Sequence, residues 1–153
     1  PAYIGVRQQH YDYQAGASMD FQPLSESECA GLAVVQSNTH HIRFEKFLSG
    51  ETTKLRVIQC EKGKDHMIAS CEIQEGEIIL KIVNHGQRAD FCYKYEGETT
   101  IVAKDVDMHL LSTEVAEGFT GCTVGMYASS NGNESPNYAR FAWFFYDPLS
   151  HGK

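Results

Sequence analysis

Seven histidines, five cysteines and 20 acidic residues are the side chains with which this 153-residue chain could bind a metal or transfer protons. The spacing of the histidines argues against a metal. His40 and His41 are adjacent, so a regular strand would point them to opposite faces, and neither HExxH nor His-x-His occurs. The sequence therefore predicts no metal site and no cofactor.

The cysteines are odd in number, form no CxxC pair and each lie in an apolar or strand-like context. They are Cys29, Cys60, Cys71, Cys92 and Cys122. This pattern predicts buried free thiols rather than a disulfide framework. Free thiols favour a cytoplasmic compartment, while a periplasmic or secreted location stays open because any signal peptide would lie upstream.

The usual catalytic signatures are absent from the sequence. It contains no GxSxG, GxxxxGK[ST] or GxGxxG, and Asp105-Val106-Asp107 lacks the rest of a calcium loop. No carboxylate pair is set off by an apolar pocket signal, so we assign no catalytic residue. The net charge of -7 disfavours nucleic acid as a partner, and no apolar run reaches the roughly 20 residues that span a bilayer.

The elements that would position these side chains read as strands, because apolar and polar residues alternate with period two along most of the chain. The expected strands are 3–14, 30–37, 40–47, 54–59, 67–72, 77–83, 89–95, 99–104, 120–128 and 137–146. Glu96-Gly97 is the clearest hairpin signal, and 108–117 is a weak helical window. The sequence predicts an all-β chain with one sandwich domain over residues 1–153.

Alternation also assigns residues to faces of these strands. Phe91, Tyr93 and Tyr95 are expected in the core, as are Tyr11 and Tyr13 from the first strand. Ile42 and Phe44 point inward, which leaves His41, Arg43 and Glu45 outside. The polar face is either solvated or in contact with another domain, or it forms the floor of a ligand groove. Its residues are Gln8, His10, His41 and Arg43.

The closing strand, 137–146, is aromatic on both faces. Strict alternation places Phe141, Trp143 and Phe145 together and Phe144 and Tyr146 on the opposite face. A strand of this kind is covered on both sides. We expect Trp143 in the core and Phe144 and Tyr146 at an interface.

Several stretches together resemble one known domain. They are VRQQHYDYQA at 6–15, AGLAVVQSNTHHIRF at 30–44, FCYKYEG at 91–97, AKDVDMHLLSTE at 103–114 and the segment 112–146. In the same order, they resemble the carboxy-terminal β-sandwich of glycoside hydrolase family 43 β-xylosidases and α-arabinofuranosidases. The resemblance covers nearly the whole chain.

The resemblance implies an antiparallel two-sheet concanavalin A-like jelly-roll sandwich that follows a five-bladed propeller. The propeller of such enzymes holds the three catalytic acids, so the implied role of this chain is non-catalytic. It would buttress the propeller and help shape the rim of a pocket for pentose-containing oligosaccharides. The corner 118–121 resembles the loop that supplies an aromatic residue to that rim, which makes Phe119 the candidate.

Two departures from the family pattern qualify these expectations. Thr99 stands where the family usually has a tryptophan, and the strands that precede the QQH segment in the family are missing. We expect either a fragment of a larger glycosidase or a second copy of the chain that fills the gap. The alternative functions are a free-standing carbohydrate-binding module and an oligomerisation element.

Overall fold

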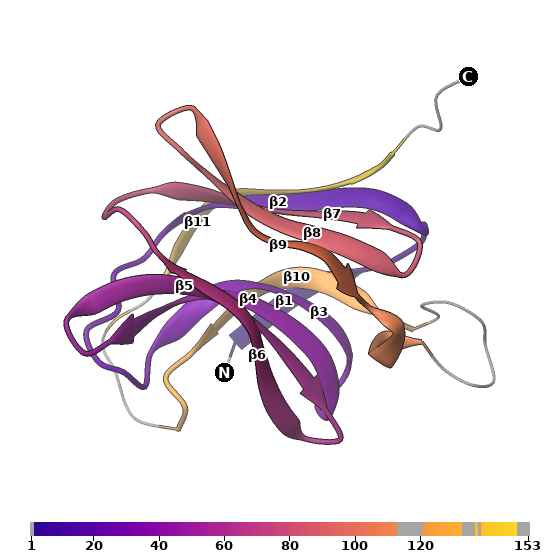
Figure 1. Ribbon diagram of the computed structural model, residues 1–153, viewed down its shortest axis with the longest axis horizontal. Coiled ribbons are helices and arrows are strands. Elements are labelled where there is room, and N and C mark those ends of the chain that lie inside the picture. The colour runs from indigo at the N-terminus through magenta and orange to yellow at the C-terminus, as the bar shows by residue number, and fades with distance from the viewer. Residues whose placement is uncertain (1, 113–120, 133–136, 138, 150–153) are drawn as a thin grey trace.

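The computed structural model describes residues 2–112, 121–132, 137 and 139–149. Within these ranges the chain forms two antiparallel sheets that lie one above the other (Figure 1). The six-stranded sheet has the order β1-β10-β3-β4-β5-β6, and the five-stranded sheet has the order β11-β2-β7-β8-β9. The prediction of an all-β, two-sheet antiparallel sandwich is confirmed.

The strand bounds follow the alternation of the sequence closely in the middle of the chain. The strands are β1 (Ala2–Arg7), β2 (Asp12–Asp20), β3 (Cys29–Ser37), β4 (His40–Ser49), β5 (Thr52–Glu61), β6 (Lys64–Glu72), β7 (Ile78–His85), β8 (Arg88–Tyr95), β9 (Glu98–Asp107), β10 (Thr123–Ser129) and β11 (Arg140–Pro148). Part of the weak helical window is a single 3-10 turn, η1 (His109–Leu111). No helix of the described residues is long and apolar enough to cross a membrane.

The expected hairpin between β8 and β9 is present. Tyr95 pairs with Glu98, and the two residues between them, Glu96 and Gly97, have φ values of 49° and 85°. Positive φ at both positions is the requirement of a type I′ turn, whose twist matches that of the strands it joins. This turn fixes the register from Tyr95 to Cys92, which directs Tyr93 into the core; the register shifts between Cys92 and Phe91.

The core lies between the two sheets and is built from the inward side of each strand. Phe44 of the six-stranded sheet meets Phe91 of the five-stranded sheet edge to face, with ring centroids 5.5 Å apart. Both side chains are fully buried, as is Tyr13. The predicted inward positions of Ile42, Phe44, Phe91 and Tyr93 are therefore confirmed.

The prediction of one strand over 3–14 is wrong. The chain leaves the six-stranded sheet after Arg7 and enters the five-stranded sheet at Asp12, so residues 8–11 form a crossing between the layers. The Tyr146 hydroxyl accepts hydrogen bonds from the backbone N–H groups of Gln9 and His10, at 3.0 and 3.2 Å. Alternation ends at this crossing, so Tyr11 is exposed rather than in the core.

The face assignment of the closing strand also needs correction. A β-bulge interrupts the register of β11 with β2 between Phe141 and Trp143. One extra residue in a strand moves the following side chains to the other face. Phe141 consequently shares the inner face with Phe144 and Tyr146, and Trp143 lies on the outer face with 44% of its surface exposed.

All five cysteines are free, as predicted, and four of them are buried. Cys71 is half-buried. The sandwich therefore owes its stability to packing and backbone hydrogen bonds rather than to cross-links.

Candidate functional site

The four residues of the predicted polar face lie in two separate places. Gln8 is buried in the crossing between β1 and β2, where its side-chain amide donates to the backbone carbonyl of His10 at 3.2 Å. His41 and Arg43 lie on β4. The register places β10 and β3 between β1 and β4, so the structure does not bring the two pairs together into one groove.

His10 and Tyr146 form the polar part of the crossing. The Nδ1 atom of His10 lies 3.2 Å from the Tyr146 hydroxyl, and the Tyr146 ring stacks on Tyr13 at 4.9 Å. Tyr146 therefore holds the crossing to the closing strand. Its ring and that of Phe144 pack on the core from the inner face of β11, and their participation in an interface stays a prediction.

Arg43 belongs to a cluster of charges on the outer face of the six-stranded sheet, which we name the Arg43 cluster: Arg43, Glu45, Arg56 and Asp65. The Glu45 carboxylate, fully buried, accepts from Arg43 Nε at 2.9 Å and from Arg56 Nη2 at 2.7 Å. Arg43 Nη2 also donates to Asp65 Oδ2 at 3.0 Å. Two cations and two anions balance, so the cluster carries no net charge.

Within the Arg43 cluster, electrostatics favour the charged forms of Arg43 and Asp65. Burial alone would lower the pKa of Arg43, but the carboxylates of Asp65 and Glu45 outweigh it and raise the pKa above its ordinary value. The hydrogen bond from Arg43 lowers the pKa of Asp65. Burial, together with the charge of Arg43, lowers the pKa of His41 and favours its neutral ring.

The same cluster borders a set of possible metal ligands that the sequence analysis did not identify. Ligand atoms of His41, Cys60 and Asp65 lie within 4.8 Å of one another, on β4, β5 and β6. Adjacent His40 and His41 gave no sign of it, because the partners come from neighbouring strands. Arg43 lies against this set: its Nη1 is 2.9 Å from His41 Nε2 and 3.3 Å from Asp65 Oδ1.

The ligand atoms of His41 and Asp65 therefore already have a hydrogen-bonding partner without an ion. A guanidinium group occupies the acceptor atoms of two of the three ligands. Burial raises the pKa of the third, the Cys60 thiol, which keeps it in the protonated form that binds metals poorly. Two of the four predicted face residues, His41 and Arg43, thus serve a balanced charge network.

Two of the surface hollows that described residues line are further candidate binding sites. One, about 600 Å³ in volume, opens between the edge strands β1 and β11 and is mostly apolar; Ile4, Phe21, Met126 and Phe141 line it. The other, about 210 Å³, lies on the outer face of the five-stranded sheet beside Phe145. Phe119, the predicted rim residue, lies outside the described residues.

The comparisons with known proteins agree along nearly the whole chain. Residues 1–147 match the family described as the beta xylosidase C-terminal concanavalin A-like domain. A xylosidase/arabinosidase of Butyrivibrio fibrisolvens is 35% identical over 146 residues, which are 94% of this chain and 28% of that protein. A non-reducing end alpha-L-arabinofuranosidase of Bacteroides ovatus is 32% identical over 151 residues, 94% of this chain and 27% of that protein.

Solved structures show the same relationship. The GH43B protein of a Bacteroides ovatus xyloglucan PUL superposes with a TM-score of 0.89 at 31% identity, covering 97% of this chain and 30% of that one. A GH43 protein of Bacillus licheniformis superposes with a TM-score of 0.85 at 28% identity, again covering 97% and 30%. The chain thus spans less than a third of the length of these relatives.

Proposed function

The chain belongs to the family of β-xylosidase C-terminal concanavalin A-like domains of GH43 proteins, and from this premise we propose that it buttresses the catalytic domain of a larger glycosidase. The partner is a five-bladed propeller that precedes it, and the substrate of the whole enzyme is a pentose-containing oligosaccharide. In this proposal the sandwich itself supplies no catalytic residue.

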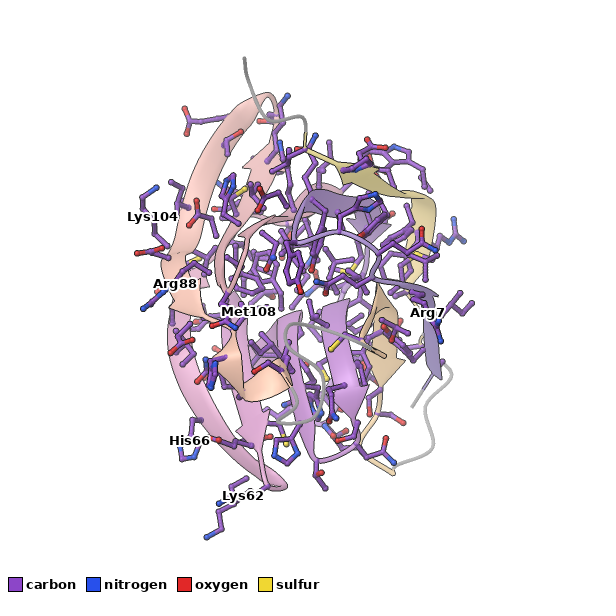
Figure 2. All side chains as sticks on the ribbon, turned by 90° about the vertical axis from the view of Figure 1, so that its right-hand side faces the viewer. Arg7, Lys62, His66, Arg88, Lys104 and Met108 are labelled. Atoms are coloured by element: carbon purple, nitrogen blue, oxygen red, sulfur yellow. The ribbon has the colours of Figure 1, made fainter. Side chains whose placement is uncertain are left out.

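One feature of the sandwich supports the proposal above the others: its open margin, which we define as the side between β1 and β11. The register aligns Ile4 with Met126 and Leu32, so Ile4 points to the same side of the sheet as the fully buried Leu32. Yet 72% of Ile4 is exposed, as is 42% of Val6. Figure 2 shows Arg7, the last residue of β1, on the opposite side of the molecule from Lys104.

An exposed apolar strip along an edge strand is typical of a surface that another domain or chain covers. The relatives are more than three times as long as this chain, and the family description calls the sandwich a C-terminal domain. In a protein with that domain order, the preceding domain would join this chain at β1, the strand that borders the open margin. The catalytic domain of the parent enzyme is therefore the proposed occupant.

The second part of the proposal concerns Phe119. The corner 118–121 places this aromatic residue between glycines rather than in an alternating strand. We assign it the role of reaching the rim of the sugar pocket, where an aromatic face packs against the C–H face of a pyranose or furanose ring.

The docking surface is tested by mixing this chain with a separately produced catalytic domain and measuring the affinity between them by calorimetry. Ile4→Asp should weaken the association at least tenfold, because a charge replaces an apolar contact at the centre of the margin. Met67→Asp is the matched control: Met67 is 60% exposed on β6, at the opposite edge of the same sheet.

Equal losses from both substitutions would refute docking at the open margin. A chain that hydrolyses a chromogenic pentoside without any catalytic domain would refute the buttress role altogether.

A further inference from the structure

The outer face of the five-stranded sheet carries a groove that none of the roles above uses. The register aligns one row of residues straight across the sheet: Phe145, Gly16, Lys81, Cys92 and Ile101. A second row beside it consists of Trp143, Ser18, Ile79, Lys94 and Thr99. The groove of about 210 Å³ lies along these rows, lined by Phe145, Ile79, Lys81, Cys92, Lys94 and Thr99.

Phe145 forms an aromatic wall of this groove. Gly16 lets its ring lie against the backbone of β2, since a methyl group there would come within 2.7 Å of the ring atom Cε1. Trp143 lies next to it, with ring centroids 5.7 Å apart and the planes tilted by 36°. The bulge in β11 turned this tryptophan outward, so two neighbouring rings face solvent on one sheet.

Two lysines supply positive charge at the same place. Lys81 lies in the same row as Phe145, with Gly16 between them, and it pairs with Cys92 on the next strand. Burial raises the pKa of the Cys92 thiol, and the charge of Lys81 opposes part of that rise. Lys94 is diagonal to Lys81 across β7 and β8. Over the described residues neither lysine takes part in a salt bridge, whereas Lys104 on the same sheet lies 3.7 Å from Asp90.

The geometry points to a binding site for an acidic sugar, namely a uronic acid unit of an oligosaccharide. The apolar C–H face of the sugar ring packs on Phe145, and its carboxylate accepts hydrogen bonds from the ammonium groups of Lys81 and Lys94. Two cations beside aromatic rings in a chain of net charge -7 fit an anion better than a neutral sugar.

The size of the groove limits the ligand. Its volume is below the roughly 300–1,000 Å³ of pockets that enclose drug-sized ligands, so it accommodates one sugar unit while the rest of the oligosaccharide stays in solvent. This site is separate from the open margin, with which it shares no lining residue. It holds for the isolated chain whether or not the buttress role is correct.

The experiment is a titration of the chain with a xylo-oligosaccharide that bears one glucuronic acid, against the unsubstituted oligosaccharide of the same length. Trp143 is the only tryptophan of the sequence, so its fluorescence reports occupation of the neighbouring groove. We expect saturable binding of the acidic oligosaccharide and at least tenfold weaker binding of the neutral one. Added salt should weaken the binding of the acidic oligosaccharide.

Variants then identify the groups responsible. Lys81→Gln and Lys94→Gln should each lower the affinity about tenfold, because each removes a hydrogen bond to a charged group. Lys104→Gln is the control, with the same charge change on the same sheet outside the groove, and should leave the affinity unchanged. Phe145→Leu tests the ring, with thermal unfolding as a check that the variant folds.

Three results would overturn the assignment. They are no binding of the acidic oligosaccharide, equal affinity for the neutral one, and a loss from Lys104→Gln as large as that from Lys81→Gln. Because the isolated chain is used without a catalytic domain, any of these results leaves the docking experiment at the open margin unaffected.

Discussion

At the scale of single residues, the burial of Glu45 is the feature that alternation alone does not explain. Glu45 points to the outer face of the six-stranded sheet, as predicted, yet it is fully buried. Arg43 and Arg56 cover it, and the guanidinium of Arg56 in turn lies 4.0 Å from the centre of the Phe47 ring. A buried carboxylate is tolerable only with such charge-assisted partners.

Glu45→Gln should lower the free energy of unfolding by about 1–3 kcal/mol, because two arginines then share a neutral acceptor in a poorly hydrated place. Urea denaturation followed by Trp143 fluorescence measures the change. Glu72→Gln, the same charge change at an exposed position of β6, should stay within about 0.5 kcal/mol of the original chain. Equal stability of the two variants would show that Glu45 is dispensable.

At the scale of elements, close approach of backbones explains a glycine within a central strand. A methyl group on Gly31 of β3 would overlap the backbone carbonyl oxygen of Phe44 on β4. Neither strand can move away, because both are paired on each side within the six-stranded sheet. Gly31 thus sets the spacing of β3 and β4 beside the Arg43 cluster.

Gly31→Ala should therefore destabilise the chain by about 1–3 kcal/mol, the usual cost of excess volume in a packed region. Gly5→Ala on the edge strand β1 is a suitable comparison: the three atoms nearest to a methyl group there all belong to the side chain of Tyr3, which can swing aside. Thermal unfolding midpoints rank the two variants. A smaller loss for Gly31 than for Gly5 would contradict this account.

The strands also show which parts of the fold the sequence pattern predicts. Alternation predicted most strands, the β8–β9 hairpin and the inward residues of β4 and β8, because these depend on neighbours in the chain. It failed at the β1–β2 crossing, which depends on the hydroxyl of Tyr146 some 136 residues away, and at the bulge of β11. A single extra residue there put Phe141 and Trp143, which were predicted on one face, on opposite faces.

The candidate sites were less predictable for the same reason. His41 and Arg43 share a face, as expected, but their separation from Gln8 and His10 follows from the insertion of β10 and β3 between them. The set His41, Cys60 and Asp65 is likewise assembled by strand order. Period-two patterns say which face a residue occupies and nothing about which strands lie side by side.

At the scale of the whole molecule, the proposed role depends on what lies beyond the sandwich. In the proposed role, Phe119 stacks on the sugar at the pocket rim. Phe119→Ala in the parent enzyme should therefore lower kcat/KM about tenfold on a short pentose oligosaccharide while unfolding is unchanged. Phe119→Trp, which keeps an aromatic face, should retain most of the activity. An unaltered kcat/KM for Phe119→Ala would remove this residue from the rim.

The pairing of the first strand with β10 has a consequence for synthesis of the protein. Ala2–Arg7 finds its partner in residues 123–128, and β2 finds one of its two neighbours in β11, at the end of the described chain. Contacts of such sequence separation form slowly. On the ribosome, β1 emerges long before β10, the strand with which it pairs, so β1 stays unpaired until residues 123–128 have been synthesised.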